Sequence, residues 1–459
     1  MRRTKIVCTI GPASEKRTVL KKMIQAGMDV ARLNFSHGTY EQHQGFIDSI
    51  RALSRELGKP IPILQDLQGP KIRVGSLPHD GLEFRQGATV HFSPRAKTYT
   101  DREQQIPVTY GGFTRDVKAG DRIMIDDGNV VCRVTSTHQG AVAARVEVGG
   151  LVTSNKGINL PDSSVRLSAL TAKDQKDVAF GVRAGVDMIV LSFVSSAEDI
   201  RKLRELIKRE EKRQNVKAGH IHIVAKMERA DAMRRMDEII EEADAVMVGR
   251  GDLGVEIPEE QVPLRQKEIV RKCRCAGVPV IVATQMLESM KEKPKATRAE
   301  VSDVANAVID HADAVMLSAE SASGKYPVKA VETLAKIAEA TEQSVFDDLR
   351  PDELCVDDQD VVLAKTIRLH AKKGAGAIVT GLQYGEIATM VNRHRPEMPV
   401  YIAAIEDQQV LQLQLRWGVT PFLLKRARSA DAFERAARAE LEERDLITKK
   451  SKVLFLTGE

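Results

Sequence analysis

The sequence predicts an α/β protein: a (β/α)₈ TIM barrel with an inserted small β-barrel domain and a C-terminal α/β domain with a mainly parallel sheet. Short Val- and Ile-rich runs alternate with amphipathic helical stretches, which is typical of parallel β/α units. After the third unit this rhythm is replaced by short alternating strands separated by turn glycines. The 459 residues allow about three domains, and we place them at 1–70 with 157–345, at 71–156, and at 346–459.

The barrel units follow one another in a regular order. Helical periodicity is clearest at 14–26, 40–57 and 328–340. The buried strands are expected where short apolar, β-branched runs occur, at Thr4–Ile10, Asp29–Asn34, Ile61–Leu67, Met188–Val194, Ile221–Met227, Ala245–Val248, Val278–Ala283 and Ala314–Leu317. About eight such units predict a closed barrel.

The two smaller domains are predicted from the same patterns. In the insert we expect strands at 82–84, 89–92, 121–125, 130–134 and 143–148. In the C-terminal domain we expect strands at 377–380, 400–404, 421–425 and 452–456, between helices at 362–373, 386–393, 409–416 and 430–442. That alternation is typical of a doubly wound sheet.

Composition excludes several classes of protein. Lys and Arg total 69 against 64 Asp and Glu, and aromatic residues make up only 4%, so we expect no nucleic-acid partner. No apolar run reaches the ~18 residues of a membrane span, so we expect no membrane partner. Five cysteines, an odd and small number, predict a reducing, cytoplasmic location without a disulfide framework. Cys273 and Cys275 are two apart in a helical pattern, so they do not share a face as metal ligands would.

Charged and polar residues stand where barrel strands end, and in this fold such positions carry catalysis. Lys226 and Glu228 point to the same side of their strand, and Asp252 follows the neighbouring strand. Two carboxylates from adjacent strands suit Mg²⁺. Cations around such an ion suit a phosphorylated anion, and the strand ends supply Arg32, Arg73 and Lys226. A layer of structural ion pairs is the alternative, but charges at five strand ends favour a site.

Two further patterns are interpreted as structural. Residues 249–254 read GRGDLG, which formally matches a dinucleotide fingerprint. We expect Val255–Pro258 to delay the helix, and 278–286 contains no acidic residue, so we favour glycines that let backbone N–H groups approach a carboxylate. His220 and His222 precede Lys226 by about 13–20 Å along the strand, so we expect them on the barrel floor.

Several segments resemble the pyruvate kinase family. They are Thr4–Ser14 (TKIVCTIGPAS), Gly27–Gly38 (GMDVARLNFSHG), Lys156–Pro161 (KGINLP), Gly249–Gly254 (GRGDLG), Ala283–Met290 (ATQMLESM), Thr297–Val308 (TRAEVSDVANAV) and Met316–Ser321 (MLSAES). The match runs in order from residue 4 to about 345 and continues more weakly through Trp417–Val419. The resemblance implies phosphoryl transfer from phosphoenolpyruvate to ADP, giving pyruvate and ATP, in a cytoplasmic homotetramer.

The resemblance also implies roles for individual residues. Lys226 would stabilise the phosphoryl group during its transfer, and Arg32 would bind the phosphate. Glu228 and Asp252 would hold Mg²⁺ or Mn²⁺. Thr284 would lie where the enolate carbon is protonated.

The same resemblance places the remaining groups around the substrates. Backbone N–H groups of Gly251 and Asp252 would bind the substrate carboxylate. The inserted domain would close as a lid that excludes water. The nucleotide would be bound by Arg73, Lys156, Asn34 and His37.

The sequence departs from the family pattern at three places. Asn34, Ser36, Asp66 and the carbonyl of Leu67 match a monovalent cation site, but Lys71 stands where K⁺-dependent members have Glu, so we expect K⁺ not to be required. The C-terminal domain lacks a final segment usual in the family, so we expect it to be shortened at its end. The loop at 380–385 lacks a Thr/Ser-rich phosphate loop, so we expect no activation by fructose 1,6-bisphosphate.

Two other functions stay open at this point. One is a barrel lyase that forms a Schiff base through Lys226, with neighbouring cations lowering the proton affinity of the amine. The other is a metabolite sensor on the same scaffold, although such a protein would be expected to lose the lysine, the metal carboxylates or the threonine.

Overall fold

The computed structural model describes residues 2–457, apart from 101–103, 139, 164, 166, 218, 220 and 348–357. Its centre is a closed barrel of parallel strands in the order β1-β16-β15-β14-β13-β12-β3-β2. These strands are β1 (Lys5–Ile10), β2 (Val30–Asn34), β3 (Ile63–Asp66), β12 (Met188–Leu191), β13 (His222–Met227), β14 (Ala245–Gly249), β15 (Val280–Ala283) and β16 (Ala314–Leu317). The predicted barrel is therefore confirmed, with half of the strand ends shifted by one to three residues.

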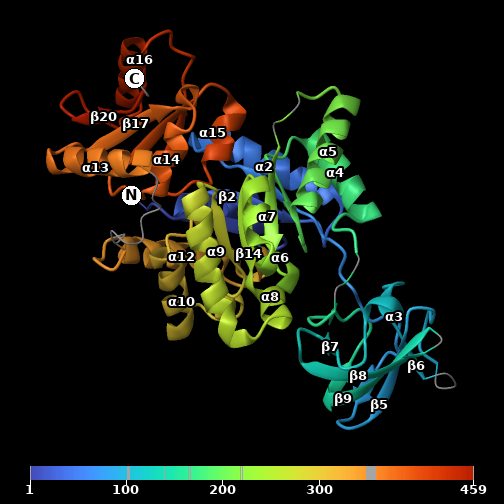
Figure 1. The fold of residues 1–459 in the computed structure, drawn as a ribbon. Helices are drawn as coiled ribbons and strands as arrows, with labels where there is room; N and C mark the ends of the chain where they lie inside the picture. Colours follow the sequence, from blue (N-terminus) through green and yellow to red (C-terminus); the bar gives the residue numbers. More distant parts are fainter. Residues whose placement is uncertain are drawn as a thin grey trace.

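Helices surround this barrel, as Figure 1 shows. They are α1 (Arg17–Ala26), α2 (Tyr40–Leu57), α4 (Ala172–Ala184), α5 (Ala197–Arg213), α6 (Ala230–Arg234), α7 (Met236–Glu242), α8 (Arg250–Glu256), α9 (Val262–Ala276), α10 (Arg298–Ile309), α11 (Ala319–Ala322) and α12 (Pro327–Glu342), with 3₁₀ turns η1 (Glu259–Gln261) and η2 (Glu288–Lys291). Local sequence defines several ends. The hydroxyl of Thr39 accepts the N–H of Gln42 in a capping box, and the left-handed Gly58 ends α2.

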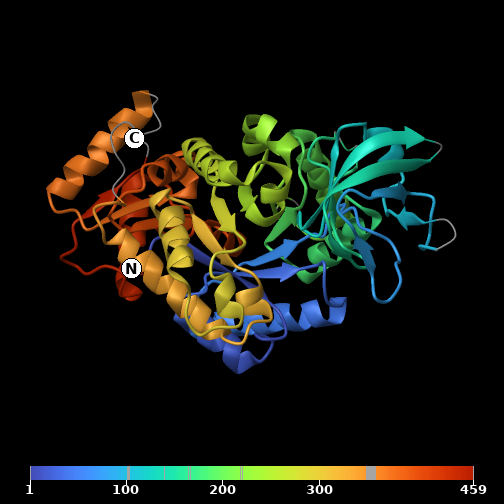
Figure 2. The ribbon, with the colours of Figure 1, turned by 90° about the horizontal axis from the view of Figure 1, so that it is seen from below.

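The inserted domain is all-β apart from the short α3 (Phe113–Asp116), and it lies at one end of the molecule (Figures 1 and 2). Its strands are β4 (Leu82–Phe84), β5 (Thr89–Ser93), β6 (Gln105–Pro107), β7 (Arg122–Ile125), β8 (Val130–His138), β9 (Ala141–Val148), β10 (Gly150–Val152) and β11 (Ile158–Asn159). Within the described residues these form a six-stranded sheet and a separate β4–β10 ladder rather than one closed ring. The predicted strands are present, and β6, β10, β11 and α3 were not predicted.

The C-terminal domain lies at the opposite end (Figure 2). It has a parallel sheet in the order β19-β18-β17-β20, as predicted. The strands are β17 (Ala377–Gly381), β18 (Val400–Ala404), β19 (Val419–Leu423) and β20 (Val453–Phe455), with α13 (Asp358–Lys372), η4 (Leu382–Tyr384), α14 (Ile387–Arg393), α15 (Asp407–Leu413) and α16 (Ala430–Glu443).

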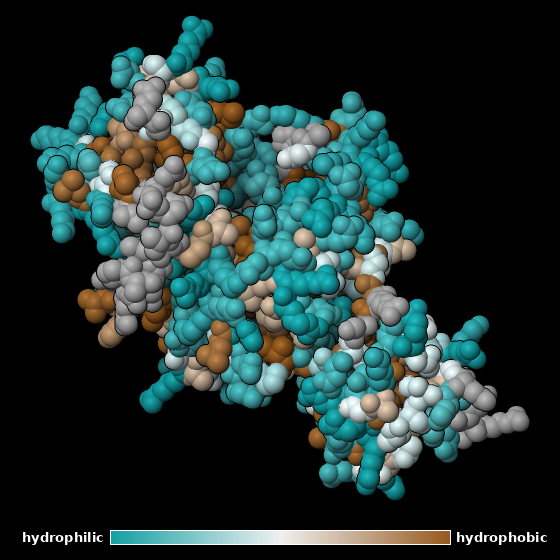
Figure 3. Space-filling model, viewed as in Figure 1, coloured by the Kyte–Doolittle hydropathy of each residue, from teal (hydrophilic) through white to brown (hydrophobic). Residues whose placement is uncertain are grey.

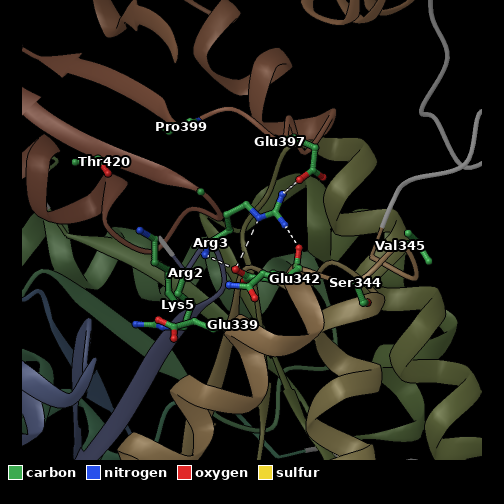
Figure 4. A pocket seen from close by; sticks show the side chains of 12 residues that line it. Arg2, Arg3, Lys5, Glu339, Glu342, Ser344, Val345, Glu397, Pro399 and Thr420 are labelled. Carbon is green, nitrogen blue, oxygen red and sulfur yellow. Dashed lines mark hydrogen bonds and ion pairs between the residues drawn. The ribbon is translucent and has the colours of Figure 1, made fainter. Parts of the chain in front are cut away.

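A buried joint connects the C-terminal domain to the barrel. Arg395 donates to both carboxylate oxygens of Asp313, at 3.0 and 2.7 Å, and the backbone N–H of Trp417 donates to the same carboxylate at 2.8 Å. Arg3 reaches across from the N-terminus, pairing with Glu342 and Glu397 (Figure 4). The guanidinium of Arg3 also stacks over the Trp417 ring.

His311 lies in this joint with its ring against Trp417. Burial first, and then the positive field of Arg395, Arg274 and Arg3, lowers the pKa of His311 to about 3. The Asp347 carboxylate lies 3.8 Å from its Nδ1 but also pairs with Arg3. The imidazole is therefore held neutral at physiological pH.

The cysteines differ in their bonding state. Cys8, Cys132 and Cys273 are free and buried. Cys275 is disulfide-bonded, so the expectation of no disulfide is wrong at this position. Among the described residues, no helix has the length and apolar character needed to cross a bilayer.

Candidate active site

A cavity of about 630 Å³ lies beside the ends of β14 and β15, on the side that faces the inserted domain, and Lys226, Glu228 and Arg32 are not among the residues that line it. Gly251, Asp252 and Gln285 line it from the barrel. Lys71 and Asp127 line it from the inserted domain and its connection to the barrel. The cavity therefore lies between two domains, where a movement of the insert would change its access to water.

Two charged pairs lie at the strand ends. Lys226 Nζ is 2.5 Å from Glu228 Oε1, and both side chains are nearly fully buried. Arg32 donates from Nε to Asp66 Oδ2 at 2.7 Å and from Nη1 to the hydroxyl of Thr9 at 2.8 Å. The cations and acids predicted at separate strand ends are thus brought together.

Burial would by itself lower the pKa of Lys226, but the carboxylates of Glu228, Asp66 and Asp252 raise it well above its ordinary value despite Arg32. The ammonium is therefore protonated at neutral pH. The idea that neighbouring cations lower its proton affinity is wrong, because the nearby acids outnumber Arg32.

The Glu228 carboxyl is fixed by its surroundings. The backbone N–H of Phe193 donates to Glu228 Oε2 at 3.1 Å. A Cβ on Gly249 would lie only 2.6 Å from Glu228 Cγ, so glycine is required there for the carboxyl to occupy its place. Burial raises the pKa of Glu228 to about 7, against the opposing effect of Lys226.

The GRGDLG segment forms α8 directly after β14. The expected delay of the helix at Val255–Pro258 is therefore wrong. The absence of an acidic residue at 278–286 still argues against a dinucleotide site. The N–H of Gly251 donates to Thr284 Oγ1 at 3.0 Å, so the helix start and the end of β15 are joined.

Arg250 is a residue to which the sequence assigned no role. Its Nη2 donates to the carbonyl of Thr284 at 2.6 Å and its Nη1 to Asp303 at 2.7 Å. Thr284 and Gln285 have φ of 67° and 56°, which is unfavourable for such side chains. The buried guanidinium therefore holds a strained turn that presents the Thr284 hydroxyl to the site.

The residues of the predicted cation site also lie close together. Asn34 and Asp66 are paired in register on β2 and β3, and Asn34 Oδ1 accepts the N–H of Ser36. Ser192, which was not predicted, donates its hydroxyl to the carbonyl of Leu67 at 2.7 Å and lies 3.2 Å from Asp66 Oδ1. His37 is exposed beside this group.

Lys71 points into the site rather than into solvent. Its Nζ lies 3.3 Å from Asp252 Oδ1, with about a quarter of its side chain exposed. Arg73 instead donates to the carbonyl of Asn155 at 2.9 Å, and Lys156 pairs with Asp126 at 2.7 Å. Lys71 therefore joins Arg32 and Lys226 in the cationic site, while the other two cations lie where the insert joins the barrel.

The oxygen groups present fit a hard divalent cation. Glu228 and Asp252 come from neighbouring strand ends, and among the described residues no group of three or more His, Cys, Asp or Glu side chains could hold a metal ion. Mg²⁺ suits such a sparse protein set, because it retains waters and takes further oxygens from a substrate.

Fold and site together define a (β/α)₈ barrel enzyme with an inserted domain over a cationic active site. Residues 1–331 match the family described as "Pyruvate kinase, barrel domain", and residues 360–459 match "Pyruvate kinase, alpha/beta domain". The chain belongs to the pyruvate kinase family and is an enzyme of that kind.

Curated relatives and a solved structure agree with this. The chain is 42% identical to the pyruvate kinase of Agrobacterium vitis, over 100% of this chain and 95% of that protein. It is 42% identical to the pyruvate kinase of Geobacillus stearothermophilus, over 91% of this chain and 71% of that one. A crystal structure of a pyruvate kinase from Cryptosporidium parvum superposes with a TM-score of 0.91 at 30% identity, covering 100% of this chain and 94% of that one.

Proposed function

We propose that this enzyme transfers the phosphoryl group of phosphoenolpyruvate to ADP, giving pyruvate and ATP. The observation that carries the proposal is the protonated Lys226 between Glu228, Asp66 and Arg32. Phosphoryl transfer needs positioning and neutralisation of charge more than a strong nucleophile, and this arrangement supplies both.

Each group has a role in that reaction. Arg32, held by Asp66 and Thr9, grips the phosphate before transfer. Lys226 neutralises charge as the phosphoryl group leaves, which lowers the barrier because the ammonium is already in place. Glu228 and Asp252 would hold Mg²⁺ or Mn²⁺, which would supply neutralisation of the negative charge on the substrate.

The helix start and the end of β15 act on the other end of the substrate. N–H groups of Gly251 and Asp252 at the first turn of α8 bind the substrate carboxylate, for which the Gly251 N–H exchanges or shares the bond that it donates to Thr284 Oγ1. The Thr284 hydroxyl accepts the Gly251 N–H and lies where the enolate carbon of pyruvate is protonated. Transfer and protonation thus use neighbouring groups.

The nucleotide binds between barrel and insert. Arg73 and Lys156 lie at the connection, with Asn34 and His37 on the barrel side. Closure of the insert brings the cations of the connection over the nucleotide and excludes water, which would otherwise accept the phosphoryl group.

The monovalent cation is a finer point of the same proposal. Lys71 already places an ammonium beside Asp252, and a second cation nearby would add repulsion in a partly desolvated site. We therefore propose that K⁺ is not required, although Asn34, Ser36, Asp66 and Leu67 are grouped as a K⁺ site would need.

The other two functions are less well supported. A Schiff-base lyase needs a neutral lysine, but the acids around Lys226 raise its pKa. A sensor needs none of the catalytic groups, yet Lys226, Glu228, Asp252 and Thr284 are all grouped in one site.

Regulation and assembly remain predictions. The Thr380 hydroxyl donates to the carbonyl of Leu456 at 2.8 Å, which supports the prediction that fructose 1,6-bisphosphate does not activate. Exposed Leu264 on α9 and Val301 on α10 supply apolar surface for the predicted homotetramer. Hydrophobic side chains also gather over the C-terminal domain in Figure 3. A cytoplasmic location remains a prediction.

The direct test is pyruvate formation from phosphoenolpyruvate and ADP, followed by coupled oxidation of NADH. We expect activity that needs Mg²⁺ or Mn²⁺ and disappears with a chelator. Borohydride treatment with pyruvate should leave Lys226 unmodified. A lack of pyruvate formation with the divalent metal present, or a covalent adduct on Lys226, would contradict the proposal.

A further inference from the structure

A second cavity lies at the other end of the barrel, where the C-terminal domain covers the starts of the strands. It has a volume of about 250 Å³. Met188, His222 and Ala245 line it at the first residues of β12, β13 and β14. Leu413 and Arg416 line it from the C-terminal domain, in which α15 lies on the side of the barrel away from the insert (Figure 1).

Arg416 is a half-buried cation that forms no salt bridge with a carboxylate of the described residues. Its Nη1 donates to the carbonyl of Gly277 at 2.9 Å, which leaves most of its N–H groups for the cavity. The carboxylate whose charge acts on Arg416 is that of Asp313, and both of its oxygens accept from Arg395. A buried charge is costly unless it is paired, so the wall of this cavity has positive charge to be compensated.

Two uncharged groups can add hydrogen-bond donors to this wall. The imidazole of His222 makes no hydrogen bond to the described residues, and this half-buried side chain lines the same cavity. Gln409 uses its Oε1 to accept the N–H of Ile405, so its amide NH₂ is left as a donor. The one acid of the wall, Asp244, is engaged by Arg204 at 3.1 Å and by the N–H of Ile223 at 2.8 Å.

We propose that this floor cavity binds a small organic anion through Arg416, His222 and Gln409. Guanidinium groups recognise phosphate and carboxylate through paired N–H donors. The volume of about 250 Å³ equals that of roughly eight waters, which suits a three- or four-carbon compound. Met188 and Leu413 provide apolar contact for its carbon skeleton.

Such a ligand bridges the barrel and the C-terminal domain. It touches the first residues of β13 and β14, and the far ends of those strands carry Lys226 and the GRGDLG segment. Occupation of the cavity therefore stabilises the docking of the C-terminal domain against the barrel that bears the active site. The inference does not depend on the proposed reaction.

The chain offers a local probe, because Trp417 is its single tryptophan and directly follows Arg416. The fluorescence emission of this tryptophan is recorded during a titration with glycerol 3-phosphate, and in a parallel titration with succinate. Both titrations are made at a constant ionic strength set with NaCl. We expect a saturable change in fluorescence with at least one of the two. Saturation with only the phosphate ester, or only the dicarboxylate, identifies the anionic group that the site prefers.

Variants separate this site from the active site. Arg416→Met should weaken binding about tenfold or more, as expected for a lost hydrogen bond to a charged group, and Arg416→Lys should weaken it less. Lys226→Met should leave the fluorescence titration unchanged, because that residue is at the opposite end of β13. Arg201→Met, an exposed arginine of α5, is the matched control.

Leu382→Phe provides a second route if Arg416→Met does not fold, since it fills the cavity that Leu382 lines and keeps the guanidinium. We expect it to abolish the titration while the protein unfolds at an unchanged or higher temperature. The proposal is overturned if neither anion gives saturation, if the change only follows ionic strength, or if the folded Arg416→Met and Leu382→Phe proteins bind like the unmodified enzyme.

Discussion

Replacement of Arg250 by Met tests whether the strained turn at Thr284 is held by this guanidinium. The change removes the donors to the Thr284 carbonyl at 2.6 Å and to Asp303 at 2.7 Å. Thr284 and Gln285 each hold a positive φ that costs about 1–3 kcal/mol, so the released turn relaxes toward ordinary backbone. A displacement of the hydroxyl by ~1 Å is worth about 10²-fold in rate, and we expect kcat to fall by that factor.

The loss should fall on kcat rather than on KM, because Arg250 acts through Thr284 and not on bound substrate. Steady-state kinetics measure this. Exchange of the pyruvate methyl hydrogens with deuterated water, followed by NMR, measures the protonation step alone and should fall at least as much. Arg250→Lys should recover part of both rates.

Arg271→Met is the matched control, because this arginine is exposed on the neighbouring α9. Urea unfolding of each variant shows whether the fold persists. If folded Arg250→Met keeps kcat within about threefold of the unmodified enzyme and exchanges pyruvate hydrogens normally, Arg250 does not position Thr284.

Three further predictions concern single groups. Lys226→Met should abolish phosphoryl transfer while phosphoenolpyruvate still binds weakly, since the ammonium mainly meets charge that develops in the transition state; near-normal kcat would contradict its role. The unmodified enzyme should be active with Mg²⁺ in a buffer whose only monovalent cation is a bulky organic one. Lys71→Glu places two acids together at Asp252 and should therefore create a K⁺ requirement. Near inactivity of the unmodified enzyme without K⁺ would show that Lys71 does not replace the ion. His311 has a folded pKa of about 3 against ~6.5 unfolded, so the unfolded chain binds more protons between these values and stability falls as pH decreases through that window. From pH 7 to 5 the free energy of unfolding should fall by about 2 kcal/mol, which urea unfolding measures. His311→Asn should remove this fall, and asparagine tolerates the left-handed φ of 62° at this position. An equal fall in both proteins would refute His311 as its origin.

Much of the fold could be predicted because its signals are local. The strands Ala314–Leu317 and Val400–Ala404 were predicted with their observed ends, since each is a compact apolar run between turn signals. β19 begins at Val419 rather than at Pro421. Proline is tolerated there because β19 is an edge strand, and edge position cannot be inferred from the local sequence.

Helix α8 shows where local propensity was misleading. Val255–Pro258 was expected to delay the helix, but the chain is helical from Arg250. Contacts from another strand explain this, because Thr284 Oγ1 accepts the Gly251 N–H and Arg250 is anchored at Thr284 and Asp303. Tertiary contacts of this kind override propensity.

The sequence by itself determined which residues stand at strand ends. Side chains alternate along a strand, so Lys226 and Glu228, which are two residues apart, point to the same side. Because the barrel strands are parallel, their carboxyl ends all lie at one face of the barrel. Both properties follow from local geometry, so the predicted acids and cations were found together.

Only the tertiary structure decided which of these groups pair. The Lys71–Asp252 contact joins residues 181 positions apart, and the Arg250–Thr284 contact joins residues 34 apart. The position of the half-buried Arg416 beside the floor cavity depends on the docking of a separate domain. A pattern along the chain fixes the face to which a side chain belongs, but its partner depends on distances that are set when strands, insert and C-terminal domain pack together.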